Sequence, residues 1–580
     1  MKYFDEYIKT DNNNIITLQT YNSNVFFNEN NKQQIIQTNR NICGDQVIVD
    51  QDNKVLDIFD RSKDKIVGIL YCNKDTTYNI NSKGNKSFLF KPLDRKYGEF
   101  IVSTSYKNKE KIYVVIQFLH WKIDAKLPTG NIINLIGPLG IIDNEQEALL
   151  YKYNLKQKNI KPVKENLEYH KKQISNIQNK NTQFNAFSID PIGCLDIDDA
   201  FSIQKYVDFF QINVHIADLS TFITDYNMYL NKPSSIYLPD KVINMIDREY
   251  SNNIVSLLEN TKRNALTAIF YFNYNFEIIN IDFKECIINI TKNYDYDNAD
   301  YIINTLDFDK SFKTNIDLLN LHKFSQKIFN QQIDDTHKLV ELWMIKANQE
   351  VGKKLYNYDK KNTLLRIHSL KDDVFDYTKY IIPENQLLNE HIKLKSYNSA
   401  KYVIDSDDIN HYGLDIDYYT HFTSPIRRLS DLLIHIQLKC LINKMPLIDI
   451  SQDTIDKINS FNKRLKSLKF DLDKLSIIQQ IQEKQFHICE AYIIAFNKSS
   501  INIFIPEFKA EYYINLYNFK LKSLIDTEIL DDKIILKYQN HKIELNLFDK
   551  LKVRLSALLK EDFLHRKLKI KIIEPCIEFL

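Results

Sequence analysis

Four aspartates lie within ten consecutive residues of this sequence, Asp190, Asp196, Asp198 and Asp199. Carboxylates are hard oxygen ligands, and Mg²⁺ prefers a few carboxylates, retained waters and the phosphate oxygens of a substrate to a closed protein cage. Carboxylates placed this close together repel one another and raise each other's pKa unless a cation lies between them. The cluster therefore predicts a site for divalent metal ions.

Two simpler interpretations of the acidic stretch fit its sequence less well. A solvated acidic turn has no need of the apolar Leu195 and Ile197 between the acids. A calcium-binding loop would need glycine at the position of Phe201 and an acidic residue at that of Val207. The apolar runs Phe187–Ile189 and Ala200–Ile203 instead predict a strand on each side, so that the acids lie on a loop between two buried strands.

A second stretch that could bind phosphate runs from Ser424 to Arg428. Ser424 is a favourable N-cap and Pro425 suits the first helical position, which predicts a helix with both arginines in its first turn. Arginines there oppose the helix dipole, which costs some stability. A phosphate bound at the helix start would be attracted both by the dipole and by the arginines, so it would reverse this cost. The alternative, surface arginines paired with Asp431, accounts for Arg428 better than for Arg427.

Both stretches resemble signatures of the ribonuclease II / ribonuclease R (RNB) family, which includes the catalytic exonuclease of the exosome. The family pattern has an Asp, three further Asp residues at six, eight and nine positions beyond it, and an Ala, and the sequence from Asp190 to Ala200 reproduces it. Thr423–Arg428 is similar to the second signature, with Leu429 in place of the usual Tyr. The resemblance implies metal binding by Asp190, Asp196 and Asp199. It also implies that Asp198 orients metal-bound water or the leaving group, that Arg427 binds the scissile phosphate, and that Arg428 has a secondary or structural role.

The resemblance implies two further contacts with RNA. Tyr237 lies in a Tyr-Leu-Pro stretch similar to one whose tyrosine stacks on a base near the 3′ end, although most of the 35 tyrosines would be expected only to pack. Glu341 lies in Val340–Asn348, which looks like a family helix near the terminal nucleotide. A carboxylate there could accept a hydrogen bond from a ribose 2′-hydroxyl and so select RNA over DNA.

The pattern of strands and helices predicts a multidomain chain. Short β-branched runs and seven of the ten glycines fall before residue 141, which is typical of small β-barrels. Phe210–Asp218 alternates apolar and polar residues, which predicts a half-buried strand. Five later runs with alternating Lys predict another barrel, and one of them is 534–537. We expect the following order: OB-type barrels at 1–78 and 79–155, a linker at 156–184, an α/β catalytic domain at 185–484, and a C-terminal OB-type RNA-binding barrel at 485–580.

The family resemblance extends to these barrels. Asn39–Val47 and Phe90–Arg95 look like parts of the first and second cold-shock domains of the eukaryotic, exosome-type branch. No segment before them could hold the extra endonuclease domain of some relatives, so that activity is not expected. Lys509 and Tyr512 stand in the last barrel where relatives usually carry glycines, which predicts a loop that binds RNA differently.

Composition limits the expected partners and location. Lys and Arg number 77 against 75 Asp and Glu, so any basic surface for RNA must be local. The seven cysteines include no C-x-x-C pair, which favours a reducing compartment without a disulfide framework. The sequence has neither an apolar run of eighteen residues nor a signal peptide. We expect a soluble monomer in the cytoplasm, with the nucleus as an alternative.

The activity that the resemblance implies is processive 3′→5′ hydrolysis of single-stranded RNA to nucleoside 5′-monophosphates. Two Mg²⁺ ions, with Mn²⁺ as a substitute, would flank the scissile phosphate. Three alternatives stay open: a catalytically silent RNA-binding or regulatory protein of the same fold, a metal-dependent DNA exonuclease, and a nuclease specialised for a narrow set of RNAs.

Overall fold

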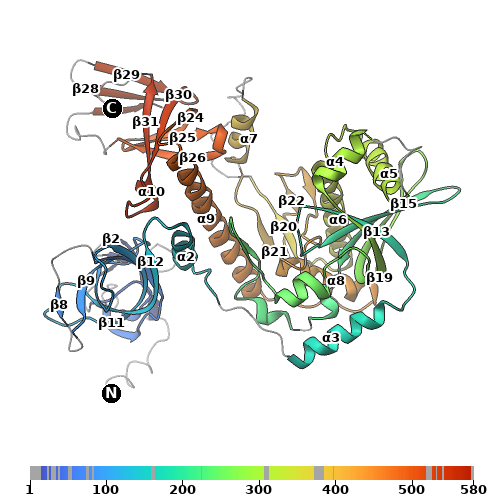
Figure 1. Ribbon diagram of the computed structural model, residues 1–580, viewed down its shortest axis with the longest axis horizontal. Coiled ribbons are helices and arrows are strands. Elements are labelled where there is room, and N and C mark those ends of the chain that lie inside the picture. Colours follow the sequence, from blue (N-terminus) through green and yellow to red (C-terminus); the bar gives the residue numbers. More distant parts are fainter. Residues whose placement is uncertain are drawn as a thin grey trace. The chain divides into compact units, whose positions relative to one another are not determined.

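The computed structural model shows two compact units, residues 157–463 and residues 1–156 with 464–580. Figure 1 shows the helices and strands of each unit. The residues that the structure describes are 15–22, 25–27, 34–36, 40–49, 55–72, 78–80, 84–157, 164–223, 225–305, 313–370, 385–395, 397–516, 526–530, 532–538 and 541–575. Asn39, Cys576 and the predicted start of the first barrel lie outside them.

A closed five-stranded barrel forms the centre of the unit 157–463. Its strands, in spatial order, are β13 (Phe184–Asp190), β14 (Asp199–Lys205), β15 (Phe210–Ala217), β18 (Thr261–Phe272) and β19 (Ile278–Asp295). The first and last strands pair in parallel and so close the ring, whereas the other pairings are antiparallel. This closure brings the end of β13 beside the end of β19, with Asp190 opposite Asp295.

The expectation of a half-buried strand at Phe210–Asp218 is wrong, because β15 is buried at every position. Strand β15 lies between β14 and β18, and the helix α6 (Thr336–Tyr358) also contacts it. Gln211, Asn213 and His215 of this strand form side-chain hydrogen bonds inside the protein, although the buried Asn213 Oδ1 atom has no partner. His215 forms hydrogen bonds of 2.8 Å with Ser202 through Nε2 and with Thr267 through Nδ1, and Asn213 donates to Ser202.

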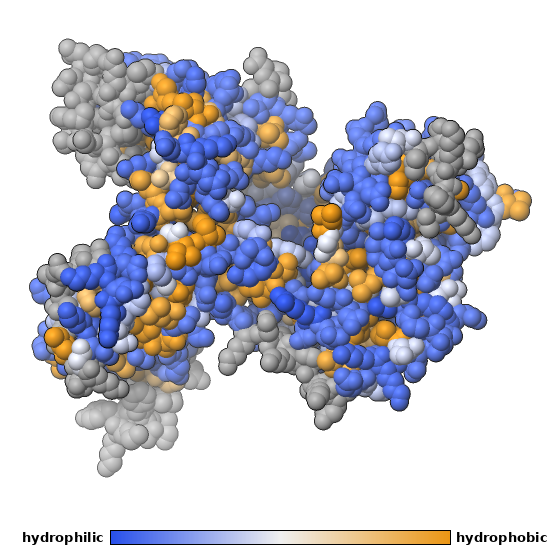
Figure 2. All heavy atoms as spheres, viewed as in Figure 1, coloured by the Kyte–Doolittle hydropathy of each residue, from blue (hydrophilic) through white to orange (hydrophobic). Residues whose placement is uncertain are grey.

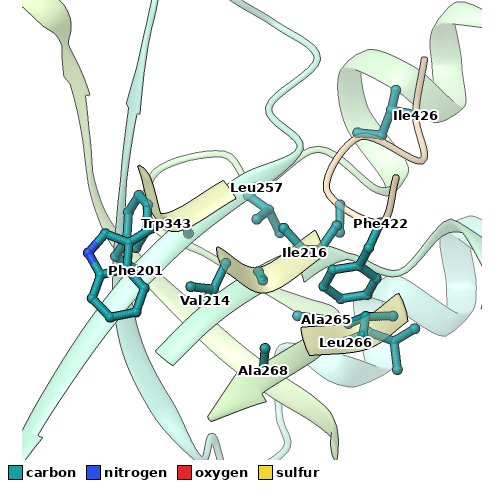
Figure 3. Close-up of a cluster of buried hydrophobic side chains, with 14 of the residues drawn as sticks. Phe201, Val214, Ile216, Leu257, Ala265, Leu266, Ala268, Trp343, Phe422 and Ile426 are labelled. Atoms are coloured by element: carbon teal, nitrogen blue, oxygen red, sulfur yellow. The ribbon is translucent and has the colours of Figure 1, made fainter. Parts of the chain in front are cut away.

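Helices surround the barrel and complete its core. Besides α6 they include α3 (Lys164–Ile177), α4 (Tyr296–Thr305), α5 (Lys313–Ile328) and α8 (Leu429–Ile442), each of which contacts a barrel strand. Figure 3 shows side chains of β14, β15, β18, α6 and the segment 422–426 in one apolar cluster. Trp343 of α6 is fully buried there, with its ring edge-on to Phe270 and Phe272.

The other unit contains the N-terminal sheets. Strands β1 (Ile15–Thr17), β5 (Gln46–Val49) and β6 (Val55–Asp60) form one sheet, and β2 (Gln19–Asn22), β3 (Val25–Phe27) and β4 (Gln34–Ile36) form another. A second ring consists of β7 (Ile66–Tyr71), β9 (Lys86–Pro92), β10 (Phe100–Thr104), β11 (Lys111–His120) and β12 (Thr129–Pro138), with β8 (Asn79–Ile80) on β9 and the helix α2 (Ile142–Lys152) after it. Strand β7 belongs to this ring although it falls within the range predicted for the first barrel. Gly68 allows its close approach to β9, because a Cβ there would lie 2.3 Å from the Lys91 carbonyl oxygen.

The same unit contains the C-terminal strands, which follow the helix α9 (Gln452–Glu483). A five-stranded sheet has the order β26 (Ala510–Asn515), β25 (Ser500–Ile505), β24 (His487–Asn497), β30 (Lys550–Ala557) and β31 (Leu568–Glu574). A separate sheet is formed by three strands that come between β26 and β30 in the sequence: β27 (Asp526–Leu530), β28 (Lys533–Tyr538) and β29 (His541–Asn546). The run 534–537, predicted as a barrel strand, therefore belongs to an insertion, and β26 takes its place in the main sheet.

Hydrophilic side chains cover most of the face in Figure 2, and apolar residues appear on it in separate groups. Among the helices within the described ranges, none has both the length and the apolar character needed to span a bilayer. The six cysteines in those ranges are all free thiols.

Candidate active site

The barrel positions the four aspartates in one short connection. Asp190 ends β13, Asp199 begins β14, and Asp196 and Asp198 lie on the loop between these strands, as predicted. The loop is fixed at Ile197, whose side chain is buried and whose N–H donates to Ser256 Oγ at 3.0 Å. The Leu195 side chain is exposed, and this residue is held only through its carbonyl oxygen, which accepts from Ser256 Oγ at 2.8 Å.

Asp190 and Asp199 have carboxylate oxygens that suit a cation. The Oδ2 atom of each is buried and has no hydrogen-bond partner. Burial, with a smaller effect of the negative charge of Asp196, raises the pKa of Asp190 to about 6. Burial and the charges of Asp190 and Asp198 raise the pKa of Asp199 well above its usual value. A divalent cation would neutralise this repulsion and satisfy the buried oxygens, so the residues present fit a metal site.

Asp198 differs from these acids because both of its carboxylate oxygens face the segment before α8. The backbone N–H of Ile426 donates to Oδ1 at 2.9 Å, and Arg427 Nε lies 3.3 Å from Oδ2. The side chain of Asp198 is only 4% exposed, and this burial raises its pKa to about 7 although Arg427 and the Ile426 N–H oppose the shift. Asp198 therefore holds the two predicted functional stretches together.

The predicted start of the arginine helix is wrong. Helix α8 begins at Leu429, so Ser424 is not its N-cap and the arginines precede the first turn. The reason is the fully buried Asp431, which accepts hydrogen bonds from the Ser424 N–H at 2.8 Å and from Arg428 Nη2 at 2.7 Å. These bonds, with the one from Ile426 to Asp198, hold residues 424–427 as a turn.

The two arginines consequently have different surroundings. Arg428 forms an ion pair with Asp431, as the simpler interpretation expected. Arg427 has a side chain that is 44% exposed and extends toward the acids, with Nη2 donating to Ser424 Oγ at 2.9 Å. Burial disfavours its charge, but Asp198 and Tyr237 outweigh this effect and raise the pKa of Arg427. Arg427 is thus the more exposed of the two arginines and the one that contacts the acidic loop.

Tyr237 lies beside Arg427. It ends the short strand β16 (Ile236–Tyr237), and the Ser235 N–H just before it donates to the Arg427 carbonyl oxygen at 3.0 Å. Burial raises the pKa of Tyr237 to about 12, with Arg427 opposing the shift and Asp196 adding to it. The ring remains half exposed, so one face can meet a ligand.

Glu341 is not joined to the acids by any contact recorded within the described ranges. It lies on an exposed face of α6, where it forms an ion pair of 2.8 Å with Lys338. A residue of the same helix does approach the site, since His337 stacks on Tyr296 with ring centroids 3.5 Å apart.

Tyr296 also lies near the acids, although no sequence pattern predicts it there. It begins α4 directly after β19, and its pKa is raised by burial and by the charges of Asp199 and Asp190. Its place beside the acids depends on the parallel pairing of β13 with β19, which joins distant parts of the chain. The only local signal is a tyrosine where a long strand ends and a helix begins.

Two protein-family models match the chain. The model described as RNB domain matches residues 178–335 and 305–444, and that described as Dis3-like cold-shock domain 2 (CSD2) matches residues 87–154. The four aspartates and both arginines lie within the first of these matches.

Relatives and solved structures are similar over most of the chain. Exosome complex exonuclease RRP44 of Mus musculus is 24% identical over 609 residues, which cover 89% of this chain and 62% of that protein. The chain thus spans less than two thirds of this relative. The structure of Mycoplasma genitalium RNase R in complex with ribose methylated single-stranded RNA has a TM-score of 0.73 at 17% identity, covering 96% of this chain and 100% of that chain. Yeast Ssd1, described as a pseudonuclease, has a TM-score of 0.64 at 14% identity, covering 99% and 98%.

Proposed function

Because this chain belongs to the RNB family, we propose that it is a metal-dependent exoribonuclease that degrades single-stranded RNA processively from the 3′ end to nucleoside 5′-monophosphates. The observation that carries the proposal is the 3.3 Å approach of Arg427 Nε to Asp198 Oδ2. The contact supports the proposal because it joins a guanidinium, which can bind phosphate, to a cluster of carboxylates, which can bind metal, and phosphodiester hydrolysis needs both kinds of group.

The acids divide into two groups in this proposal. Asp190, Asp196 and Asp199 would hold the metal, and the unpartnered Oδ2 atoms of Asp190 and Asp199 support that assignment. The chemistry that two bound Mg²⁺ ions, or Mn²⁺ in their place, would supply is stabilisation of charge around the scissile phosphate. Asp198 orients the attacking water or the leaving group, because its carboxylate is held in one position by Ile426 and Arg427.

Arg427, Tyr237 and Glu341 bind the RNA in this proposal. A guanidinium has five N–H donors, so Arg427 keeps donors for a phosphate oxygen beside its contacts with Asp198 and Ser424. Tyr237 offers a half-exposed ring on which any base can stack, which suits a sequence-tolerant enzyme. Glu341 would exchange its exposed pairing with Lys338 for a ribose 2′-hydroxyl, since such surface pairs contribute little to stability. Arg428 has a structural role in this proposal: its ion pair with Asp431 helps to hold the turn that carries Arg427.

A catalytically silent RNA-binding protein of the same fold is the second candidate function. The similarity to yeast Ssd1, described as a pseudonuclease, favours it. The four aspartates and Arg427 weigh against it, since a silent protein has no need of two buried carboxylate oxygens without partners.

The test uses the purified chain and single-stranded RNA labelled at the 3′ end, with Mg²⁺. Release of the label as a nucleoside 5′-monophosphate in the first turnover, abolished by a chelator, is the expected result. RNA binding without release would favour the silent protein. Equal rates on substrates that end at the 3′ side in a ribonucleotide or in a 2′-deoxyribonucleotide would favour a DNA exonuclease.

We further propose that the protein is a monomer and acts in the cytoplasm. Size-exclusion chromatography and imaging of the tagged chain would check these two points.

A further inference from the structure

We propose that the C-terminal sheet carries a separate metal site, of a type that binds Zn²⁺, formed by His487, Cys489 and Glu507. One ligand atom from each of these residues lies within 4.8 Å of the others. His487 and Cys489 are two positions apart on β24, so their side chains lie on the same face of the strand. Glu507 reaches them from the single turn Pro506–Phe508, which follows β25.

The three side chains form a small site that is open to solvent. Cys489 is buried at its base, whereas the side chains of His487 and Glu507 are 21% and 51% exposed. His487 Nε2 lies 2.9 Å from Glu507 Oε2, and the ring of Phe508 meets the imidazole edge-on at 5.6 Å, which fixes its orientation. An ion can therefore enter from the surface and keep a water molecule as a fourth ligand.

The donor types select the metal. A thiolate, an imidazole and a carboxylate are the groups that bind Zn²⁺, and three protein ligands with one water complete its tetrahedral coordination. Mg²⁺ prefers oxygen ligands only and would not compete at a thiol. The site thus differs in metal preference from the aspartate cluster of the candidate active site.

The thiol lies at the base of the site. Cys489 is buried beneath the more exposed His487 and Glu507, so an ion held by these two side chains also meets the sulfur. When Zn²⁺ binds, the S–H bond breaks, a Zn–S bond forms and the proton passes to solvent, with no change in oxidation state. A simple His487–Glu507 ion pair would explain two of the residues but not the thiol beneath them.

The bound ion would link the turn Pro506–Phe508 to strand β24. Lys509, directly after this turn, has a left-handed backbone with φ of 48°, which is unfavourable for a residue with a side chain. Coordination of Glu507 by an ion held on β24 would keep the turn, and with it the connection from β25 to β26, in this conformation. The bound ion would therefore stabilise the C-terminal sheet and would take no part in the chemistry of the aspartates.

A cobalt titration of the full chain tests the proposal. Co²⁺ replaces Zn²⁺ in such sites and gives a thiolate-to-metal charge-transfer absorption band only when a cysteine is a ligand. After metal removal, the wild-type chain should develop this band with one equivalent of Co²⁺, and Zn²⁺ but not excess Mg²⁺ should abolish it. Cys489→Ser should lack the band, and Glu507→Gln, altered at a half-exposed position that does not endanger folding, should bind Co²⁺ about 10-fold more weakly or worse.

Cys194→Ser is the matched control, because Cys194 also lies beside a carboxylate, 3.7 Å from Asp196 Oδ1. That variant and Asp198→Asn should keep the band. The absence of a band in the wild-type chain, its persistence in Cys489→Ser, or its loss in Cys194→Ser would overturn the proposal. None of these readouts requires RNA hydrolysis, so the outcome is independent of the proposed exoribonuclease activity.

Discussion

Arg427 Nε and Asp198 Oδ2 lie 3.3 Å apart, although the two residues come from distant parts of the sequence. The neighbouring bond from the Ile426 N–H to Asp198 Oδ1 makes this a two-point junction. The junction joins the acidic loop to the turn before α8, so each segment positions the functional groups of the other.

Substitution of the two neighbouring arginines should separate catalysis from stability. Arg427→Ala removes a half-exposed guanidinium that faces the acids, so kcat on single-stranded RNA should fall about 10²–10³-fold. Arg428→Ala leaves the buried Asp431 without its ion-pair partner and should lower the free energy of unfolding by about 3–5 kcal/mol. Turnover and chemical denaturation of both variants check this. Similar kcat losses in the two variants at equal stability would contradict the division of roles.

The raised pKa of Asp190 predicts a pH-dependent effect of metal on stability. The pKa of Asp190 is about 6 in the folded state and near 4 in the unfolded state. Between these pH values the folded protein holds a proton on Asp190 that the unfolded protein has lost. The free energy of unfolding of the metal-free protein therefore falls as the pH rises from about 4 through 6. Asp190→Asn should therefore be more stable than the wild type at pH 8 without metal, by on the order of 1–3 kcal/mol, and this difference should vanish near pH 4.

Mg²⁺ should reverse that order. At pH 8 the ion should raise the melting temperature of the wild type and have a smaller effect on Asp190→Asn, because the variant lacks one carboxylate ligand. Melting curves with Mg²⁺ and with a chelator measure both effects. An identical response of the two proteins to Mg²⁺ would remove Asp190 from the metal site.

Glu341 should determine the choice between RNA and DNA. Glu341→Ala should reduce the ratio of rates on oligonucleotides with a 3′-terminal ribose and a 3′-terminal deoxyribose, while stability changes by no more than about 0.5 kcal/mol because its pair with Lys338 is exposed. Lys338→Ala is the matched control and should keep the wild-type ratio. An unchanged ratio in Glu341→Ala would show that this helix face does not meet the terminal sugar.

Tyr237 should contribute by stacking and not through its hydroxyl. Tyr237→Ala should weaken RNA binding by about 1–3 kcal/mol, whereas Tyr237→Phe should bind nearly as well as the wild type. Fluorescence anisotropy with labelled RNA under chelating conditions measures binding without hydrolysis. Equal losses in both variants would instead indicate that the hydroxyl, which lies by Arg427, is the important group.

The sequence was sufficient for the features that depend on local pattern. The family and the multidomain fold class with OB-type barrels were predicted and are confirmed. Apolar runs around the acids marked β13 and β14 because a strand flanked by turn residues is a local signal. The domain boundaries and the roles of the individual site residues stay predictions.

Features that depend on distant contacts could not be predicted. The Ser-Pro signal for a helix start was overridden by bonds to the buried Asp431 and Asp198, which fix a turn instead. The period-two pattern of β15 indicated a solvent face, but the closed barrel and its surrounding helices bury that face. Tyr296 reaches the site through the pairing of β13 with β19, and no local pattern encodes this pairing.

The most direct test of the central claim compares the wild-type chain with Asp198→Asn on 5′-labelled single-stranded RNA in the presence of Mg²⁺. The variant keeps the size of the side chain and one acceptor for the Ile426 N–H, so it should fold and bind RNA, while its degradation rate should fall at least about 100-fold. If Asp198→Asn shortens the RNA as fast as the wild-type chain, the junction of Asp198 with Arg427 is not the catalytic centre.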